Sequence, residues 1–389
     1  MSETTVRGAE ATGDVVQRLP VMHGPRRRRR RSPYLRTDYR GELALFPYSG
    51  PRLAVVAVTV LLVAAYPFLA DAYWLGVINL AVIAAIGALG LQIVTGMAGQ
   101  LSLGHAAFLA VGGFFAAGLY LHLGLPLWIA GPVAMLAGAA VGAIAGLPAL
   151  RIRGFYLGIT TLAVQYVIIA VGLKYQGYLQ TAFGTTGSLS LPVPDLGLFT
   201  LTSTMDWYYF LVVLAGVVIL VVTNLKRSAL GRSLLAVRQR ELAAEALGVN
   251  VARVKITAFA LSGALGGLAG ALSAYYYRGV GIEDFDLLLS VEYLAMIIVG
   301  GLGSILGAVL GALFVIATPL LVGQLIATFG LGGVLSQHLR AIELAVFALT
   351  MIGFLLFEPD GLAGVWQRLK TYVTRWPFKY TAMSTQAKR

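Results

Sequence analysis

The sequence predicts an all-α, polytopic integral membrane protein with about ten transmembrane helices. Of its 389 residues, 58% are hydrophobic and only 12% are charged, whereas a soluble domain carries about 25% charged residues. Apolar runs long enough to cross a bilayer follow one another through most of the chain. The chain also holds 47 glycines, a density typical of membrane helices that pack backbone against backbone.

Each predicted span is an apolar run close to the roughly 20 residues that a helix needs to cross the hydrocarbon. The runs are, approximately, 53–70, 73–94, 101–121, 127–147, 155–173, 207–223, 255–276, 288–300, 303–322 and 340–357. The 288–300 run is too short to cross alone, so we interpret it as half of a broken helix.

The distribution of charge predicts which side of the membrane each loop faces. With the N-terminus inside, all of the 29 Lys and Arg residues except Lys174, Arg278 and Arg340 fall in inner segments. Basic residues collect on the cytoplasmic side of membrane proteins, so both termini are predicted to be cytoplasmic. The net charge of +12 then reflects contact with anionic membrane lipid, and we exclude nucleic acid as a partner.

Three regions are predicted along the chain. Residues 1–50 form a basic arm with six consecutive arginines at 26–31, which we interpret as a cytoplasmic, partly disordered segment that touches anionic lipid. A twin-arginine export signal is the alternative, although no convincing cleavage site follows. Residues 51–358 form the transmembrane domain, and residues 359–389 form a basic cytoplasmic tail.

Two glycine trios have a spacing of four residues. They are Gly138, Gly142 and Gly146, and Gly303, Gly307 and Gly311. This spacing puts each trio on one helix face, where it predicts close packing against a second helix. Each trio lies toward the end of one half of the chain, which indicates a two-fold internal repeat with broken helices.

The stretch GMAGQLSLGH at 96–105 places polar residues among glycines inside an apolar region. We expect the chain to unwind at GMAGQ, with Ser102 as the N-cap of a helix whose first turn includes His105. Unwound backbone is tolerated in a membrane only beside protein or a water-lined cavity, and its free N–H and C=O groups could receive a zwitterionic ligand. Gln100, Ser102 and His105 are therefore candidates for a substrate pathway. The alternative is that they bond within the helix bundle.

Two acidic residues and one outer loop supply further candidates. Glu292 and Glu343 lie in or at the edge of apolar spans, where carboxylates are costly. They either serve a pathway or gate, or form buried pairs. Thr185, Thr186 and Ser188 lie on an outer loop, where they either line a vestibule and contact a docking protein or form a capped turn.

No catalytic constellation is visible, so the chain is predicted not to be an enzyme. It has no cysteine and four scattered histidines, which gives no metal-ligand spacing. It also lacks the GxxxxGK[ST] sequence of a phosphate-binding loop. No metal and no cofactor are predicted.

The inner segment 224–255 is the most informative polar stretch of the sequence. It predicts a short helix from Ser233 to Leu247, followed by Gly248 in the C′ position. Such a helix either lies on the lipid surface or docks into a partner protein.

Six stretches together resemble the permease subunit of branched-chain amino acid ABC importers, the LivM-type member of the pair. They are GMAGQLSLGHAAFLAVGGFFAA at 96–117, LRIRGFYLGITTLAV at 150–164, FGTTGSLSLP at 183–192, SALGRSLLAVRQRELAAEALGVNVARVKITAFALSGALGGLAGAL at 228–272, SVEYLAMIIVGGLGSILGAVLGA at 290–312 and FEPDGLAGVW at 357–366. They cover most of residues 90–366 in the order typical of that family, while the arm before residue 50 has no recognised counterpart.

This resemblance implies a division of labour in a bacterial inner membrane. A second homologous permease subunit completes the pore, two cytoplasmic ATPase subunits bind inside, and an extracytoplasmic substrate-binding protein delivers the substrate. The segment 224–255 then couples the permease to the ATPases. The residues that the resemblance implies for this role are Arg238, Glu241, Ala243, Ala244 and Gly248. Leu242 interrupts the Glu-Ala-Ala run that is typical of such importers.

Two other functions stay open at the level of sequence. One is a secondary transporter driven by an ion gradient, with Glu292 or Glu343 as its ion site, and the other is a structural subunit without a pathway. Within the importer class, the substrate is expected to be a branched-chain amino acid, with urea or short amides as the alternative. The second permease is either a paralogue or another copy of this chain.

Overall fold

The computed structural model describes residues 64–152, 154–184, 189–194, 200–328, 339–358 and 361–375. Within them, seven helices are long and apolar enough to cross a membrane, which confirms the predicted all-α, polytopic fold class. The arm 1–50, most of the predicted span 53–70, and Thr185, Thr186 and Ser188 lie outside the described residues.

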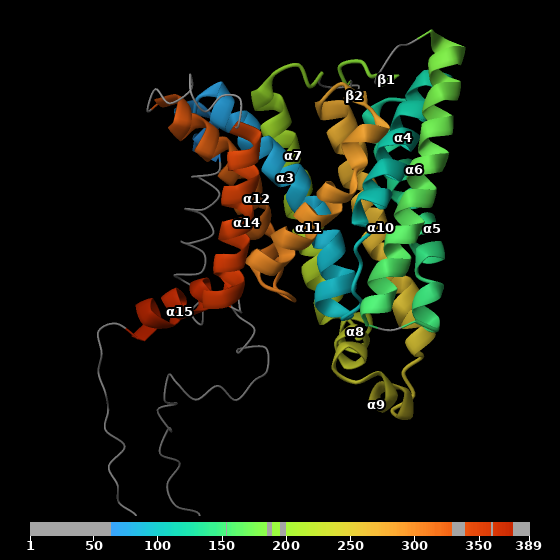
Figure 1. The fold of residues 1–389 in the computed structure, drawn as a ribbon, viewed down its shortest axis with the longest axis vertical. Helices are drawn as coiled ribbons and strands as arrows, with labels where there is room; N and C mark the ends of the chain where they lie inside the picture. Colours follow the sequence, from blue (N-terminus) through green and yellow to red (C-terminus); the bar gives the residue numbers. More distant parts are fainter. Residues whose placement is uncertain are drawn as a thin grey trace, which may run out of the picture. The chain divides into compact units, whose positions relative to one another are not determined.

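The helices follow the predicted spans in order (Figure 1). They are α3 Ala72–Leu91, the π-helix η1 Gln92–Met97, α4 His105–Leu123, α5 Leu127–Ala145, η2 Pro148–Leu150, α6 Phe155–Phe183, α7 Thr204–Arg227, α8 Ala229–Gln239, α9 Glu241–Ala246, α10 Val251–Tyr276, η3 Ile282–Phe285, α11 Leu287–Gly300, α12 Ile305–Thr328, α14 Leu339–Phe357 and α15 Gly361–Arg375. The short strands β1 Leu189–Ser190 and β2 Gly279–Val280 pair antiparallel. This pair lies at the opposite end of the bundle from α8 and α9 (Figure 1).

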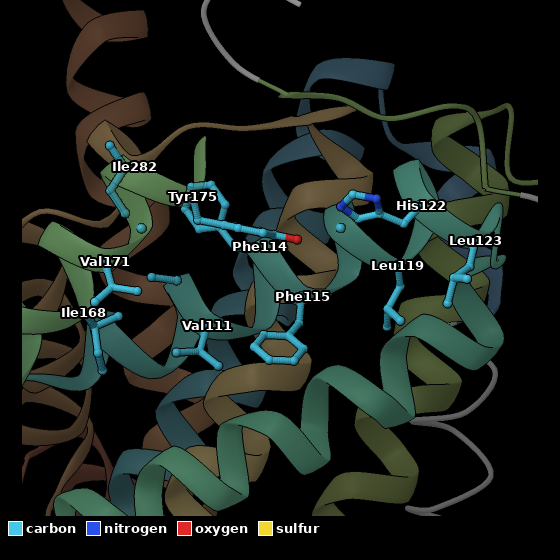
Figure 2. Close-up of a pocket in the computed structure, with 13 residues that line it drawn as sticks. Val111, Phe114, Phe115, Leu119, His122, Leu123, Ile168, Val171, Tyr175 and Ile282 are labelled. Atoms are coloured by element: carbon cyan, nitrogen blue, oxygen red, sulfur yellow. The ribbon is translucent and has the colours of Figure 1, made fainter. Parts of the chain in front are cut away.

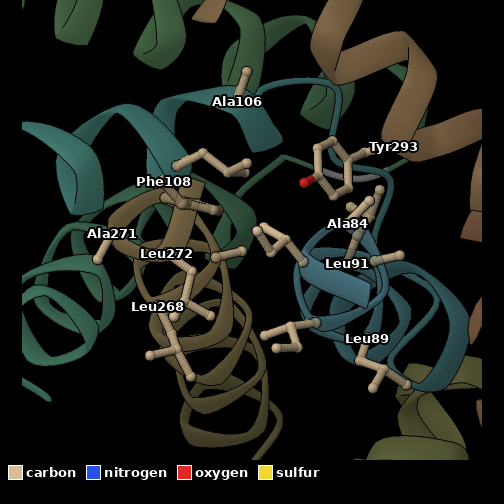
Figure 3. Close-up of a cluster of buried hydrophobic side chains, with 14 of the residues drawn as sticks. Ala84, Leu89, Leu91, Ala106, Phe108, Leu268, Ala271, Leu272 and Tyr293 are labelled. Carbon is tan, nitrogen blue, oxygen red and sulfur yellow. The ribbon is translucent and has the colours of Figure 1, made fainter. Parts of the chain in front are cut away.

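The helix α10 lies at the centre of the core, where α3, α4 and α5 pack against it. Figure 3 shows this cluster, with Phe108 of α4 and Leu268 and Leu272 of α10 among its buried side chains. Lipid tails are as apolar as these side chains, so association in a membrane depends on close van der Waals packing.

Glycines allow α5 and α10 to pack backbone against backbone. A Cβ at Gly138 would collide with the carbonyl oxygen of Gly263, and a Cβ at Gly142 would collide with that of Phe259. At Gly146, a Cβ would lie 3.0 Å from the Phe259 Cβ. Gly138 and Gly142 therefore share the face of α5 that lies on α10, and Gly146, the C-cap residue of α5, faces Phe259 of the same helix α10.

The second glycine trio is divided between a turn and a helix. Gly307 and Gly311 of α12 face the carbonyl oxygens of Gly300 and Met296 on α11. The prediction that Gly303 shares this helix face is wrong, because α12 begins at Ile305. Gly303 lies in the preceding turn with φ +88°, a conformation that a glycine adopts without steric cost. The short run 288–300 forms the helix α11, and its interpretation as half of a broken helix stays a prediction.

Candidate functional site

The predicted break before α4 is present. After α3 the backbone forms the π-helix η1, and it then leaves helical geometry until His105. Gly99 has φ +69° within this stretch, and the Gln100 N–H bonds the carbonyl of Val94 at 3.0 Å. Single π-helical turns inside α-helices are frequent at functional sites. We call residues 92–104 the first break.

The prediction that Ser102 caps α4 is wrong. The N-cap residue is Gly104, which makes no side-chain hydrogen bond. A Cβ at Gly104 would collide with the carbonyl oxygen of Thr161, so the close approach of α6 selects glycine at this position. The Ser102 hydroxyl is buried and makes no hydrogen bond to any described residue.

Side chains from two other helices bond the N–H groups at the start of α4. The Thr161 hydroxyl of α6 accepts from Leu103 N at 2.9 Å, and the Ser290 hydroxyl of α11 accepts from Ala106 N at 2.9 Å. Ser290 in turn donates to Gln165 of α6 at 2.8 Å. Donors that would be costly to bury in a membrane therefore have protein partners, and these two are not free to bind a ligand.

A second break, residues 301–304 between α11 and α12, lies against the first. The Gln92 amide donates to the carbonyls of Gly301 at 3.0 Å and Ser304 at 2.9 Å. A Cβ at Gly96 would lie 2.8 Å from the Gly303 nitrogen. Because Gln92 and Gly301 are 209 positions apart in the chain, this junction depends on the tertiary fold.

Cationic side chains from the predicted coupling segment bond carbonyls in both breaks. Arg238 of α8 donates to the carbonyl of Gly96, and Lys226, near the end of α7, donates to the carbonyl of Gly303 at 2.8 Å. Cations are favoured at the C-terminal ends of helices, where carbonyl groups lack helical partners. The segment 224–255 is thus bonded directly to the unwound backbone.

Glu241 is the second point at which this segment contacts the first break. Its Oε1 accepts from the Gln100 amide at 3.3 Å and lies 2.8 Å from the Lys255 Nζ. A cavity of about 620 Å³ lies beside these residues. Its lining residues are Ala98, Gly99, Gln100, Val237, Arg238, Gln239, Arg240, Glu241, Leu242 and Ala243.

The predicted single helix 233–247 is wrong, because two helices occupy this segment. At Arg240 the backbone is extended, with φ −156° and ψ 110°, so α8 ends at Gln239 and α9 begins at Glu241. The break allows Glu241 to reach Gln100 while Leu242 stays 71% exposed. Gly248 has φ +83° and follows the last turn of α9, which is the C′ geometry that the sequence predicted.

The other predicted pathway residues lie apart from this junction. His105 is fully buried and its Nε2 lies 2.9 Å from the carbonyl oxygen of Gly87, while its ring packs near Phe108 and Tyr293. Glu292 is partly buried on α11. Glu343 falls within α14, but its side chain lies outside what the structure describes.

Sequence reasoning missed several residues that form hydrogen bonds at the two breaks or in the segments packed around them. They are Gln92, Thr161, Gln165, Lys226, Lys255 and Ser290. A usable signal was present for Gln92 and Gln165, because an amide inside an apolar span requires a partner. Lys255 gave a similar signal, as a lysine at the first position of the predicted span 255–276.

An apolar cavity of about 550 Å³ lies between α4 and α6. Figure 2 shows its lining, which includes Phe114, Phe115, Leu119 and Val171 with His122 and Tyr175 as the polar-tipped members. It contains none of the predicted pathway residues.

Among the described residues, no group of His, Asp and Glu is arranged to hold a metal ion.

Apolar spans that surround two bonded helix breaks define a polytopic membrane protein with an internal polar junction. Over residues 73–355 the chain matches the family described as the permease component of branched-chain amino acid transport systems. The chain therefore belongs to this permease family. It is a multi-pass membrane transport subunit of the kind found in ABC importers.

Individual relatives agree with this assignment. The chain is 33% identical over 290 residues to the high-affinity branched-chain amino acid transport system permease protein LivM of Escherichia coli K12, which covers 69% of this chain and 67% of that protein. It is 28% identical to a probable LivH permease of Methanocaldococcus jannaschii, covering 75% and 91% of the two chains. It is also 28% identical to the ribose import permease protein RbsC of Haemophilus influenzae, covering 59% and 71%. No solved structure matches the chain.

Proposed function

We propose that this chain is the membrane-spanning permease subunit of an ATP-driven importer that moves branched-chain, hydrophobic amino acids into the cytoplasm. The observation that carries the proposal is the set of bonds from α7, α8 and α9 to the two helix breaks. A segment bonded in this way can transmit movement from a cytoplasmic partner to unwound backbone inside the membrane. The relatives named for branched-chain amino acid transport support the substrate class.

The exposed side of α9 is the proposed docking surface for the ATPase. Leu242 and Leu247 are 71% and 83% exposed, and Ala243 and Gly248 are also exposed. Glu241 and Ala244 of the same helix face the protein instead, with Ala244 2% exposed. The five residues implied to couple the permease to the ATPase therefore fall into two groups. Ala243 and Gly248 contact the ATPase, whereas Arg238, Glu241 and Ala244 attach α8 and α9 to the rest of the permease.

The charge pattern supports a cytoplasmic position for this end of the bundle. The Ala149 carbonyl, in the short loop between α5 and α6, accepts from Lys255 at 3.0 Å, so two segments predicted to be inside lie together. Basic residues favour the cytoplasmic side. We therefore place α8, α9 and both termini in the cytoplasm of a bacterial cell, with the β1–β2 pair facing the external binding protein.

Transport requires three kinds of partner in this proposal. Two ATPase subunits supply the energy, because the chain itself has no phosphate-binding loop. A second permease subunit completes the pore, and a binding protein delivers the substrate. The outward apolar side chains of α5 and α6, among them Leu136, Ile144 and Val167, suit contact with lipid or with that second permease.

The test is uptake of labelled leucine by cells that lack this gene, with and without the gene restored. We expect restored uptake that stops when ATP is depleted and continues when the proton gradient is collapsed. Uptake that follows the gradient would instead favour a secondary transporter with Glu292 as its ion site. Transport of urea, a short amide or ribose without leucine would keep the importer and replace the substrate.

A further inference from the structure

Lys255 is a buried cation that the proposed docking surface does not include. It lies near the start of α10, with 2% of its side chain exposed. A buried charge is costly unless it is paired and hydrogen-bonded. The Lys255 Nζ meets both conditions, because it lies 2.8 Å from Glu241 Oε1 and donates to the Ala149 carbonyl at 3.0 Å.

These bonds join segments that are distant in the chain. Glu241 is the first residue of α9, Ala149 belongs to η2 in the α5–α6 loop, and Lys255 belongs to α10. The same Glu241 oxygen accepts from Gln100 of the first break at 3.3 Å. One lysine and one glutamate thus connect α9 with α10, with the α5–α6 loop and with the unwound backbone.

We propose that Lys255 is a positioning residue for energy coupling, because it transmits displacement of α9 to α10, to the α5–α6 loop and to the first break. This inference rests on the proposed function and adds a residue to it. An ATPase that binds Leu242 and Leu247 would move α9 as a rigid helix. Glu241 lies on the inner side of that helix with 17% of its side chain exposed, where charge-assisted bonds are screened little by water.

The experiment uses the whole complex, reconstituted in liposomes with its ATPases and its binding protein. Lys255→Met removes the ammonium group and keeps an unbranched side chain of similar length. We expect ATPase subunits still to co-purify and basal ATP hydrolysis to stay within about twofold of wild type. Leucine transported per ATP, and stimulation of hydrolysis by loaded binding protein, should each fall at least tenfold.

Arg253→Met is the matched control, because Arg253 is exposed and lies two positions earlier in the same helix. The complex that carries this control variant should couple ATP hydrolysis to transport as the wild type does.

A second variant distinguishes loss of coupling from misfolding of the permease. Lys255→Met alone removes the cation beside the partly buried Glu241 carboxylate, so the double variant K255M/E241M removes both charges, a replacement that is often neutral or stabilising. It should assemble and remain uncoupled, because the bonds to Ala149 and Gln100 are lost. Wild-type coupling in K255M or in the double variant overturns the role of Lys255. Failure of the wild-type complex to bind ATPases or to use ATP overturns the proposed function instead.

Discussion

Gly138 of α5 and Gly263 of α10 face each other so closely that a Cβ on either one would collide with the carbonyl oxygen of the other. Reciprocal contact of this kind cannot be relieved by turning a side chain, because both atoms that would be struck belong to the backbone. The contact fixes the distance between two helices that form much of the core.

Gly138→Leu should prevent stable assembly of the bundle, because the helices would have to separate. Gly138→Ala should destabilise the protein by about 1–3 kcal/mol, as overpacking typically does. The measurement is the thermal unfolding midpoint in detergent, together with the yield of monodisperse protein. Gly216→Leu on α7 is the control, because a Cβ there meets nothing within 4 Å. Equal yields for the Gly138 and Gly216 variants would contradict the packing argument.

Gly99→Ala should reduce transport more than Gly124→Ala. Both glycines have positive φ, +69° and +64°, so the backbone cost of adding a side chain is similar. A Cβ at Gly99 would lie 2.9 Å from the Arg238 side chain, whereas one at Gly124 meets nothing within 4 Å. Displacing Arg238 weakens its bond to Gly96, so leucine uptake at matched expression should fall several-fold. Equal uptake by the two variants would count against a role for this contact.

Leu247→Arg should release the ATPase subunits while the permease stays folded. The side chain is 83% exposed at the end of α9, so a change there costs little stability but alters the proposed docking surface. Co-purification of ATPase with tagged permease is the measurement. Tyr277→Arg, at a 65% exposed position beside β2, is the control at the opposite end of the bundle. Undiminished binding by the Leu247 variant would place the ATPase elsewhere.

Ser290→Ala should destabilise the protein by about 1–3 kcal/mol, the usual cost of leaving a buried hydrogen-bonding group unpaired. The change removes the acceptor for Ala106 N and the donor to Gln165. Ser233→Ala, which removes a hydroxyl bonded only within α8 at an exposed site, should shift stability by less than about 0.5 kcal/mol. Unfolding midpoints that do not separate the two variants would show that the Ser290 bonds contribute little.

The spans and the first break were predictable because hydrophobicity and glycine placement are local properties. The break at GMAGQ and the short α11 could both be read from the chain. The Ser102 cap was wrong because α4 begins only at His105, where Gly104 is the N-cap residue and Ser290, from a distant helix, accepts from Ala106 N. The single helix 233–247 was wrong because apolar periodicity does not reveal that Glu241 turns inward to bond Lys255 and Gln100.

The role of Gly303 shows a further limit of spacing arguments. Its four-residue relation to Gly307 and Gly311 holds in the sequence, but the helix begins two positions later. The turn that contains Gly303 is fixed by the first break and by Lys226, which bonds its carbonyl. A pattern along one segment carries no information about these partners.

The glycine contacts between α5 and α10 have a mechanical consequence for the position of Lys255. Where two helices touch through their backbones, no side chain at the contact can change its rotamer to accommodate a movement. A displacement applied at Lys255 would therefore tilt α5 and α10 together as one rigid unit. A helix of 26 residues is about 39 Å long, and a tilt of roughly 5° at one end would carry the other end about 3 Å. That far end leads directly into β2, so in the proposed orientation a small displacement on the cytoplasmic side would move the outer end of the bundle.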